Sequence, residues 1–167
     1  MTNARKAIAA TALAVCIGFS GTALADSHEG FAAYSKQGQF DEVLQDLQDA
    51  IINRGYVIDY VGNVDLMLER TSEAASSVTA EGAKSPYLNA KFVQFCSAKL
   101  THEAVSASPL NLAICPYVTF AFETRSEPGK VTVGYRRPIP GPSKATKKAF
   151  GKIEGLLDEI TKEAAAE

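Results

Sequence analysis

The sequence predicts a single α+β domain in which an antiparallel sheet packs against helices. Four segments are rich in β-branched and aromatic residues and suit strands, near residues 56–61, 89–96, 117–124 and 130–136. Two segments, near 40–53 and 144–163, instead repeat apolar residues at the three-to-four spacing of a helix. The turn Glu127-Pro128-Gly129 joins the last two strands directly, which makes them an antiparallel hairpin.

The N-terminal segment has the order of parts found in a secretory signal peptide. Arg5 and Lys6 precede an uncharged run over residues 7–18, and Ala23-Leu24-Ala25 offers the small residues that signal peptidase accepts. We expect cleavage before Asp26, a periplasmic or secreted protein, and no transmembrane segment in the mature chain. Cys16 loosely suggests a lipobox, but Val15 is too bulky for that motif.

The length and charge of the chain indicate a single domain and argue against a nucleic-acid-binding protein. The chain has 167 residues, with 17 Lys and Arg against 19 Asp and Glu. Removing residues 1–25 leaves 142 residues and 15 basic against 19 acidic side chains, a net charge of −4. This charge argues against nucleic acid as a partner. We expect one domain over 26–142, followed by a C-terminal amphipathic helix over 143–167.

The first half of the mature chain predicts a strand, a helix, a second strand and a short helix. A short strand is expected at 31–35, and the helix that follows buries Phe40, Val43 or Leu44, Leu47 and Ile51 before Gly55 ends it. A strand over 56–61 comes next. Asn63 is then expected to cap a helix over 64–73, and a polar loop follows over 74–86.

The second half predicts a strand ending at Cys96, a helix over 98–107 stopped by Ser108-Pro109, and the hairpin. In the first hairpin strand Val118, Phe120 and Phe122 share one face, and Tyr117, Thr119 and Ala121 share the other. Three prolines stiffen the connector to the last helix. That helix presents one apolar stripe, formed by Phe150, Ile153, Leu157 and Ile160.

Two motifs over residues 31–140 resemble the domain-of-unknown-function 302 family. The family pattern F-x-x-v-x-x-x-l-x-x-x-I-x-x-x-G-[FY] corresponds to Phe40 to Tyr56, and its proline-cysteine strand entry to Pro109 through Pro116. This chain differs in that Pro116 follows Cys115 instead of preceding it. The resemblance implies a curved antiparallel sheet backed by helices, with a TATA-box-binding-protein-like topology, and a homodimer. It implies no established reaction.

Cys96 and Cys115 are the only cysteines after the leader. Each lies at the boundary of a predicted strand, so we expect them to converge at one end of the sheet, with α-carbons within about 7 Å. Three interpretations remain open: a structural disulfide, two buried free thiols, or a redox or soft-metal pair. No C-x-x-C motif and no histidine pair accompanies them.

Three further residues are candidates for a ligand or redox site. His102 lies between the two cysteines and is a possible third ligand, although a solvent-exposed helical histidine is the simpler interpretation. Tyr117 is expected near the cysteines, or else in the core. Arg136, beside Arg137, could bind a carboxylate or phosphate. The simpler interpretation is that its charge on an edge strand discourages aggregation.

The sequence therefore favours a non-enzymatic exported binding or accessory protein, expected to be homodimeric, with a small ligand or a protein as partner. It contains no G-x-S-x-G motif and no glycine-rich phosphate loop. No catalytic residue and no cofactor is assigned. The alternative is a periplasmic thiol redox or copper-handling protein that uses Cys96 and Cys115, for which copper would be the cofactor.

Overall fold

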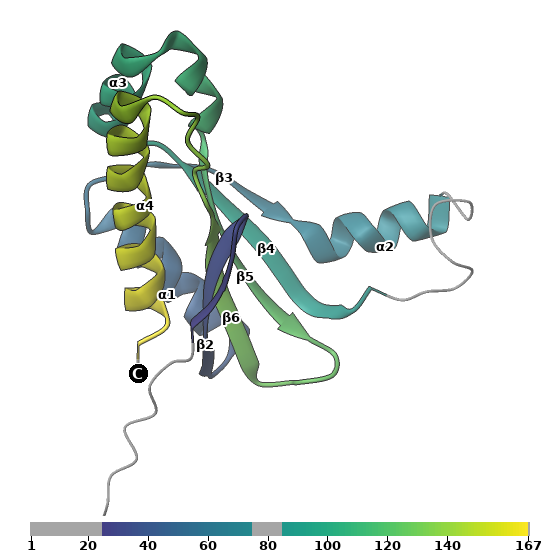
Figure 1. Ribbon diagram of the computed structural model, residues 1–167. Coiled ribbons are helices and arrows are strands. Elements are labelled where there is room, and N and C mark those ends of the chain that lie inside the picture. The colour runs from purple at the N-terminus through teal and green to yellow at the C-terminus, as the bar shows by residue number, and fades with distance from the viewer. Residues whose placement is uncertain (1–24, 75–84, 167) are drawn as a thin grey trace, which may run out of the picture.

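The computed structural model describes residues 25–74 and 85–166, and it confirms the α+β fold with an antiparallel sheet (Figure 1). The strands lie in the order β1-β2-β6-β5-β4-β3, and every neighbouring pair is antiparallel. Strands β2 to β6 form the main sheet, and β1 extends it at one edge. The strands are β1 (Ala25–His28), β2 (Phe31–Gln37), β3 (Ile58–Asn63), β4 (Tyr87–Phe95), β5 (Tyr117–Thr124) and β6 (Lys130–Arg136).

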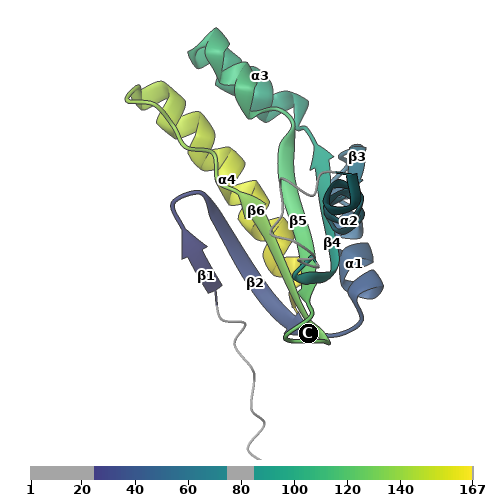
Figure 2. The same cartoon turned by 90° about the vertical axis from the view of Figure 1, so that its right-hand side faces the viewer.

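The helices lie mainly on one side of this sheet. Helices α1 and α4 pack against each other and against the sheet, and α3 packs on α4, whereas α2 projects from the opposite side (Figures 1 and 2). No helix within residues 25–74 and 85–166 is long and apolar enough to cross a membrane. The helices are α1 (Phe40–Ile52), α2 (Val64–Ala74), α3 (Ala98–Ala107), the 3-10 helix η1 (Pro109–Ile114) and α4 (Lys144–Ala164).

The core lies between α1, α4 and the face of the sheet that they cover, which we call the inner face. The predicted stripe of α1 is confirmed, since Phe40, Val43, Leu44, Leu47 and Ile51 are all buried. On β5, the side chains that face these helices are Tyr117, Thr119 and Ala121. Two of them, Thr119 and Ala121, are small. Small residues on the central strand leave room for the large side chains of two helices.

The opposite, outer face carries aromatic rings that lie over glycines of neighbouring strands. Phe92 pairs with Gly62, and Phe120 pairs with Gly134. A Cβ atom added at Gly62 would lie 2.2 Å from the Phe92 ring, and one added at Gly134 would lie 2.4 Å from the Phe120 ring. These glycines are therefore required by packing, because each ring occupies the space of a side chain.

Polar contacts hold α4 against the edge of the inner face. The Tyr34 hydroxyl donates to Asp158, and Lys162 lies 2.7 Å from the same carboxylate. Burial, together with the nearby Asp158 and Glu154 charges, raises the pKa of Tyr135 to about 12. Hydrogen bonds from Lys162 and Tyr34 outweigh burial and hold the pKa of Asp158 below its usual range.

Several predicted boundaries were displaced. Strand β3 begins at Ile58 and runs through Asn63, because the amide of Tyr56 still bonds to the carbonyl of Ile51 and continues the turn after α1. Asn63 is the last residue of β3 and directly precedes α2, which begins at Val64 as predicted, and its side chain accepts a hydrogen bond from Lys91. The leader up to residue 24 and most of the predicted 74–86 loop lie outside the described residues.

Candidate functional site

The predicted convergence of the two cysteines is confirmed, and they form a disulfide. Phe95 at the end of β4 is paired with Tyr117 at the start of β5, so Cys96 and Cys115 emerge at the same end of the sheet. Their α-carbons are 6.0 Å apart. Cys115 has the extended backbone expected for a residue before proline, with φ −95° and ψ 129°. Of the three interpretations, the bridged form is the one that the structure contains.

An aromatic stack lies next to this disulfide. The Phe95 ring packs edge-on against Tyr117 and tilted against Tyr56, with ring centroids 5.6 Å apart in both pairs. The Tyr117 hydroxyl is hydrogen-bonded to Thr101 of α3 at 2.9 Å, and the residue is only 1% exposed. Burial raises its pKa. Tyr117 is therefore a core residue that ties α3 to the sheet.

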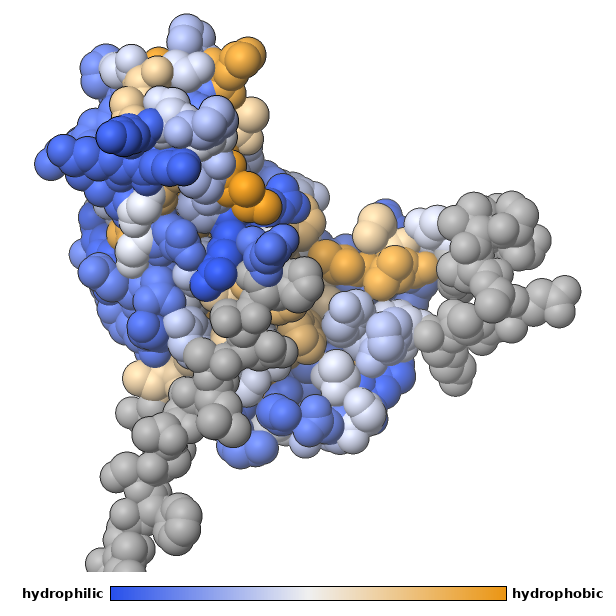
Figure 3. Space-filling model, viewed as in Figure 1, coloured by the Kyte–Doolittle hydropathy of each residue, from blue (hydrophilic) through white to orange (hydrophobic). Residues whose placement is uncertain are grey.

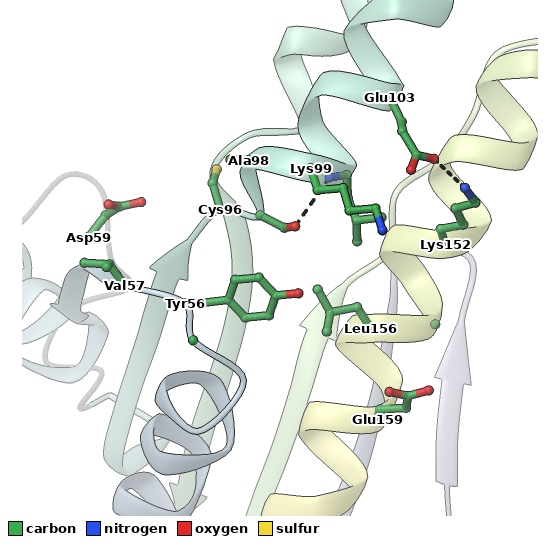
Figure 4. Close-up of a pocket in the computed structure, with 14 residues that line it drawn as sticks. Tyr56, Val57, Asp59, Cys96, Ala98, Lys99, Glu103, Lys152, Leu156 and Glu159 are labelled. Carbon is green, nitrogen blue, oxygen red and sulfur yellow. Dashed lines mark hydrogen bonds and ion pairs between the residues drawn. The ribbon is translucent and has the colours of Figure 1, made fainter.

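An open hollow of about 830 Å³ borders the disulfide, between the turn that leads into β3, the start of α3 and one side of α4 (Figure 4). Its size is within the range of small-molecule sites. In the view of Figure 4 the Tyr56 ring points toward Leu156, with Lys99 above them and Glu159 below. The lining residues are Gly55, Tyr56, Val57, Asp59, Cys96, Ser97, Ala98, Lys99, Leu100, Glu103, Lys152, Gly155, Leu156 and Glu159.

The hollow contains charges of both signs. Lys152 and Glu103 form an ion pair across it, and this contact, with the further charges of Lys99 and Lys148, holds the pKa of Glu103 below its usual range. The other charged lining residues are Lys99, Asp59 and Glu159, and none of them takes part in the ion pairs of the described residues. One cation and two carboxylates are thus available to a ligand.

The structure does not bring the remaining sequence candidates into this hollow. His102 is exposed on α3 and is absent from the lining. Arg136 is exposed at the end of β6, on the outer face, whereas Arg137 forms an ion pair with Glu154 at 3.1 Å. Within residues 25–74 and 85–166, no group of three or more His, Cys, Asp or Glu side chains is placed to hold a metal ion.

The sequence analysis missed the residues that α4 contributes. Lys152, Leu156 and Glu159 recur at helical spacing beside the apolar stripe, so they share one side of the helix. This spacing was the available signal. The spacing does not reveal the position of α3, which forms the opposite wall of the hollow.

Comparisons with known proteins support the fold alone. No protein-family profile matches the sequence, and no curated protein matches it. Among solved structures, the chain is similar to an uncharacterized conserved DUF302 protein from Bacillus stearothermophilus. The TM-score is 0.65 at 12% sequence identity, and the match covers 82% of this chain and 99% of that protein. The chain therefore has the fold of a DUF302 protein, as the motifs around Phe40 and Pro109 predict.

Proposed function

We propose that this chain is an exported, non-enzymatic binding protein and that the hollow beside Cys96 is its ligand site. Lys99 and Glu159 lie on opposite sides of Tyr56 and Leu156, and this arrangement is the observation that carries the proposal. It suits a small molecule with one anionic and one cationic group on an apolar body, as in an amino acid or a short peptide. Export rests on the leader residues before Asp26.

A thermal-shift screen of amino acids and dipeptides tests this site. A ligand at about 100 times its dissociation constant should stabilise the protein by about 2.7 kcal/mol, which raises the melting temperature by several degrees. Lys99→Ala and Glu159→Gln should each reduce that shift. Arg70→Ala on α2 removes an exposed charge far from the hollow and should leave it unchanged. Equal shifts in all three variants would contradict the proposal.

We further propose that the protein is a homodimer that buries the outer face of the sheet. Tyr60 is 56% exposed there and packs on Phe92 with ring centroids 5.7 Å apart. Exposed aromatic residues of this kind are enriched in interfaces.

Light scattering should give twice the monomer mass, and Tyr60→Asp should give the monomer mass. The matched control is Ile52→Asp, because Ile52 is 51% exposed on α1. A monomeric parent protein would exclude the dimer.

The redox alternative is supported by one observation. Cys96 lines the hollow and directly precedes Ser97, the N-cap of α3, so one sulfur of the bridge borders the proposed ligand site. Equilibration with glutathione separates the two functions. A reduction potential below about −300 mV is typical of a structural disulfide, and a value near −200 mV would favour thiol exchange. A copper role would additionally require that the reduced protein retains copper in metal analysis.

A further inference from the structure

The end of the molecule beyond the disulfide exposes large apolar side chains, and Figure 3 shows an orange group at the upper right of this end, beside hydrophilic residues. Leu110 and Leu112 of η1 are 86% and 64% exposed, and Ile139 of the proline-rich connector is 69% exposed. We call Leu110 and Leu112, together with Lys144, Lys147 and Lys148, the tip. Single exposed leucines are common, but a concentration of them on one end marks an interaction surface.

A hydrogen-bonded asparagine holds the parts of the tip together. The side-chain amide of Asn111 donates to the carbonyl of Ala104 at 2.8 Å and to the hydroxyl of Thr146 at 3.1 Å. This contact fixes η1 against α3 and against the first turn of α4. Leu110 and Leu112 flank Asn111, just as the three lysines flank Thr146. The elements that carry the leucines and the lysines are therefore held together at this end of the molecule.

The tip is basic although the whole chain is acidic. Lys144, Lys147 and Lys148 are exposed, and none takes part in the ion pairs of the described residues. The segments that carry these residues, 109–114 and 137–148, contain no aspartate or glutamate, and Glu103 of α3 is the acidic residue that interacts electrostatically with Lys148. Although the whole protein has a net charge of −2, the lysines of the tip produce a local positive field that attracts anions.

We propose that the tip docks the protein on an anionic phospholipid bilayer. Exposed leucine side chains enter the boundary between headgroups and acyl chains, and lysines at the same end contact the lipid phosphates. The lysine charges are complementary to such a surface, and the apolar residues lie beside them on the same end. The inference does not rest on the ligand site, because the hollow and the tip use different residues.

Vesicle flotation tests this inference on protein purified from a periplasmic extract, whose start at Asp26 is verified by mass spectrometry. Binding to an equal mixture of phosphatidylcholine and phosphatidylglycerol is expected, with far weaker binding to phosphatidylcholine alone. Each lysine near an anionic surface contributes about fivefold, so Lys144→Gln with Lys147→Gln should weaken binding about 25-fold. Leu110→Ser with Leu112→Ser should weaken it at least about tenfold.

Matched pairs elsewhere on the chain serve as controls. Arg70→Gln with Lys130→Gln removes two positive charges from α2 and the hairpin, and Ile52→Ser with Leu66→Ser removes two apolar side chains that are 51% and 52% exposed. Both pairs should bind like the parent protein. The proposal is overturned if the parent protein does not bind anionic vesicles, or if the control pairs lose as much binding as the tip pairs. A change of oligomeric mass in the leucine variant without vesicles would instead make the tip an interface between copies.

Discussion

Replacing Cys96 and Cys115 together by serine is expected to lower the free energy of unfolding by about 3 kcal/mol. The bridge spans a sequence separation of 19 residues, and its main effect is to restrict the unfolded chain. It also joins the ends of β4 and β5 at the point where α3 and η1 leave the sheet. Urea denaturation followed by circular dichroism measures the loss.

Reduction provides the control for this prediction. Dithiothreitol should destabilise the parent protein by a similar amount and should leave the double-serine variant unchanged, because that variant has no bridge to break. A loss well under about 1 kcal/mol in both experiments would mean that the bridge does not constrain the unfolded chain as the loop-closure argument requires.

Substituting Gly134 with alanine is expected to cost about 3 kcal/mol, the upper part of the range for overpacked cores. The new methyl group would lie 2.4 Å from the Phe120 ring and 2.5 Å from the backbone oxygen of Ala32. The ring has some freedom to move, but the backbone oxygen belongs to the paired strand β2 and has little. The change therefore strains the middle of the sheet.

Gly151→Ala is the matched control for Gly134→Ala. Gly151 lies in α4, and an added Cβ atom meets nothing within 4 Å. Alanine should stabilise this helix position by up to about 1 kcal/mol, because it loses less backbone freedom on folding than glycine does. If both substitutions had the same small effect, the close contact between Phe120 and Gly134 would not organise the sheet.

Secondary structure was most predictable where the local pattern and the flanking residues agree. Helix α3 has the predicted bounds, because Ser97 caps its start and Ser108-Pro109 stops it. The 3-10 helix η1 was missed, since residues 109–114 show neither helical nor strand periodicity. Strand β3 was placed two residues early, because Tyr56 and Val57 have strand propensity but belong to the turn after α1.

The candidate site was only partly predictable. Proximity of the two cysteines followed from the predicted strand boundaries. The hollow did not, because its walls come from residues more than fifty positions apart, namely Lys99 of α3 and Glu159 of α4. Periodicity places Lys152 and Glu159 on the polar side of α4, but only tertiary packing brings α3 beside them.

Mapping where a ligand binds tests whether the hollow is a ligand site. A dipeptide from the thermal-shift screen would be titrated into ¹⁵N-labelled protein, and amide chemical shifts would be followed. The perturbed resonances are expected to cluster at residues 55–59, 96–103 and 152–159, and Lys99→Ala is expected to weaken the saturable shifts. Perturbations confined to the outer face of the sheet, or no saturable shifts with any compound that stabilises the protein, would contradict a ligand site in the hollow.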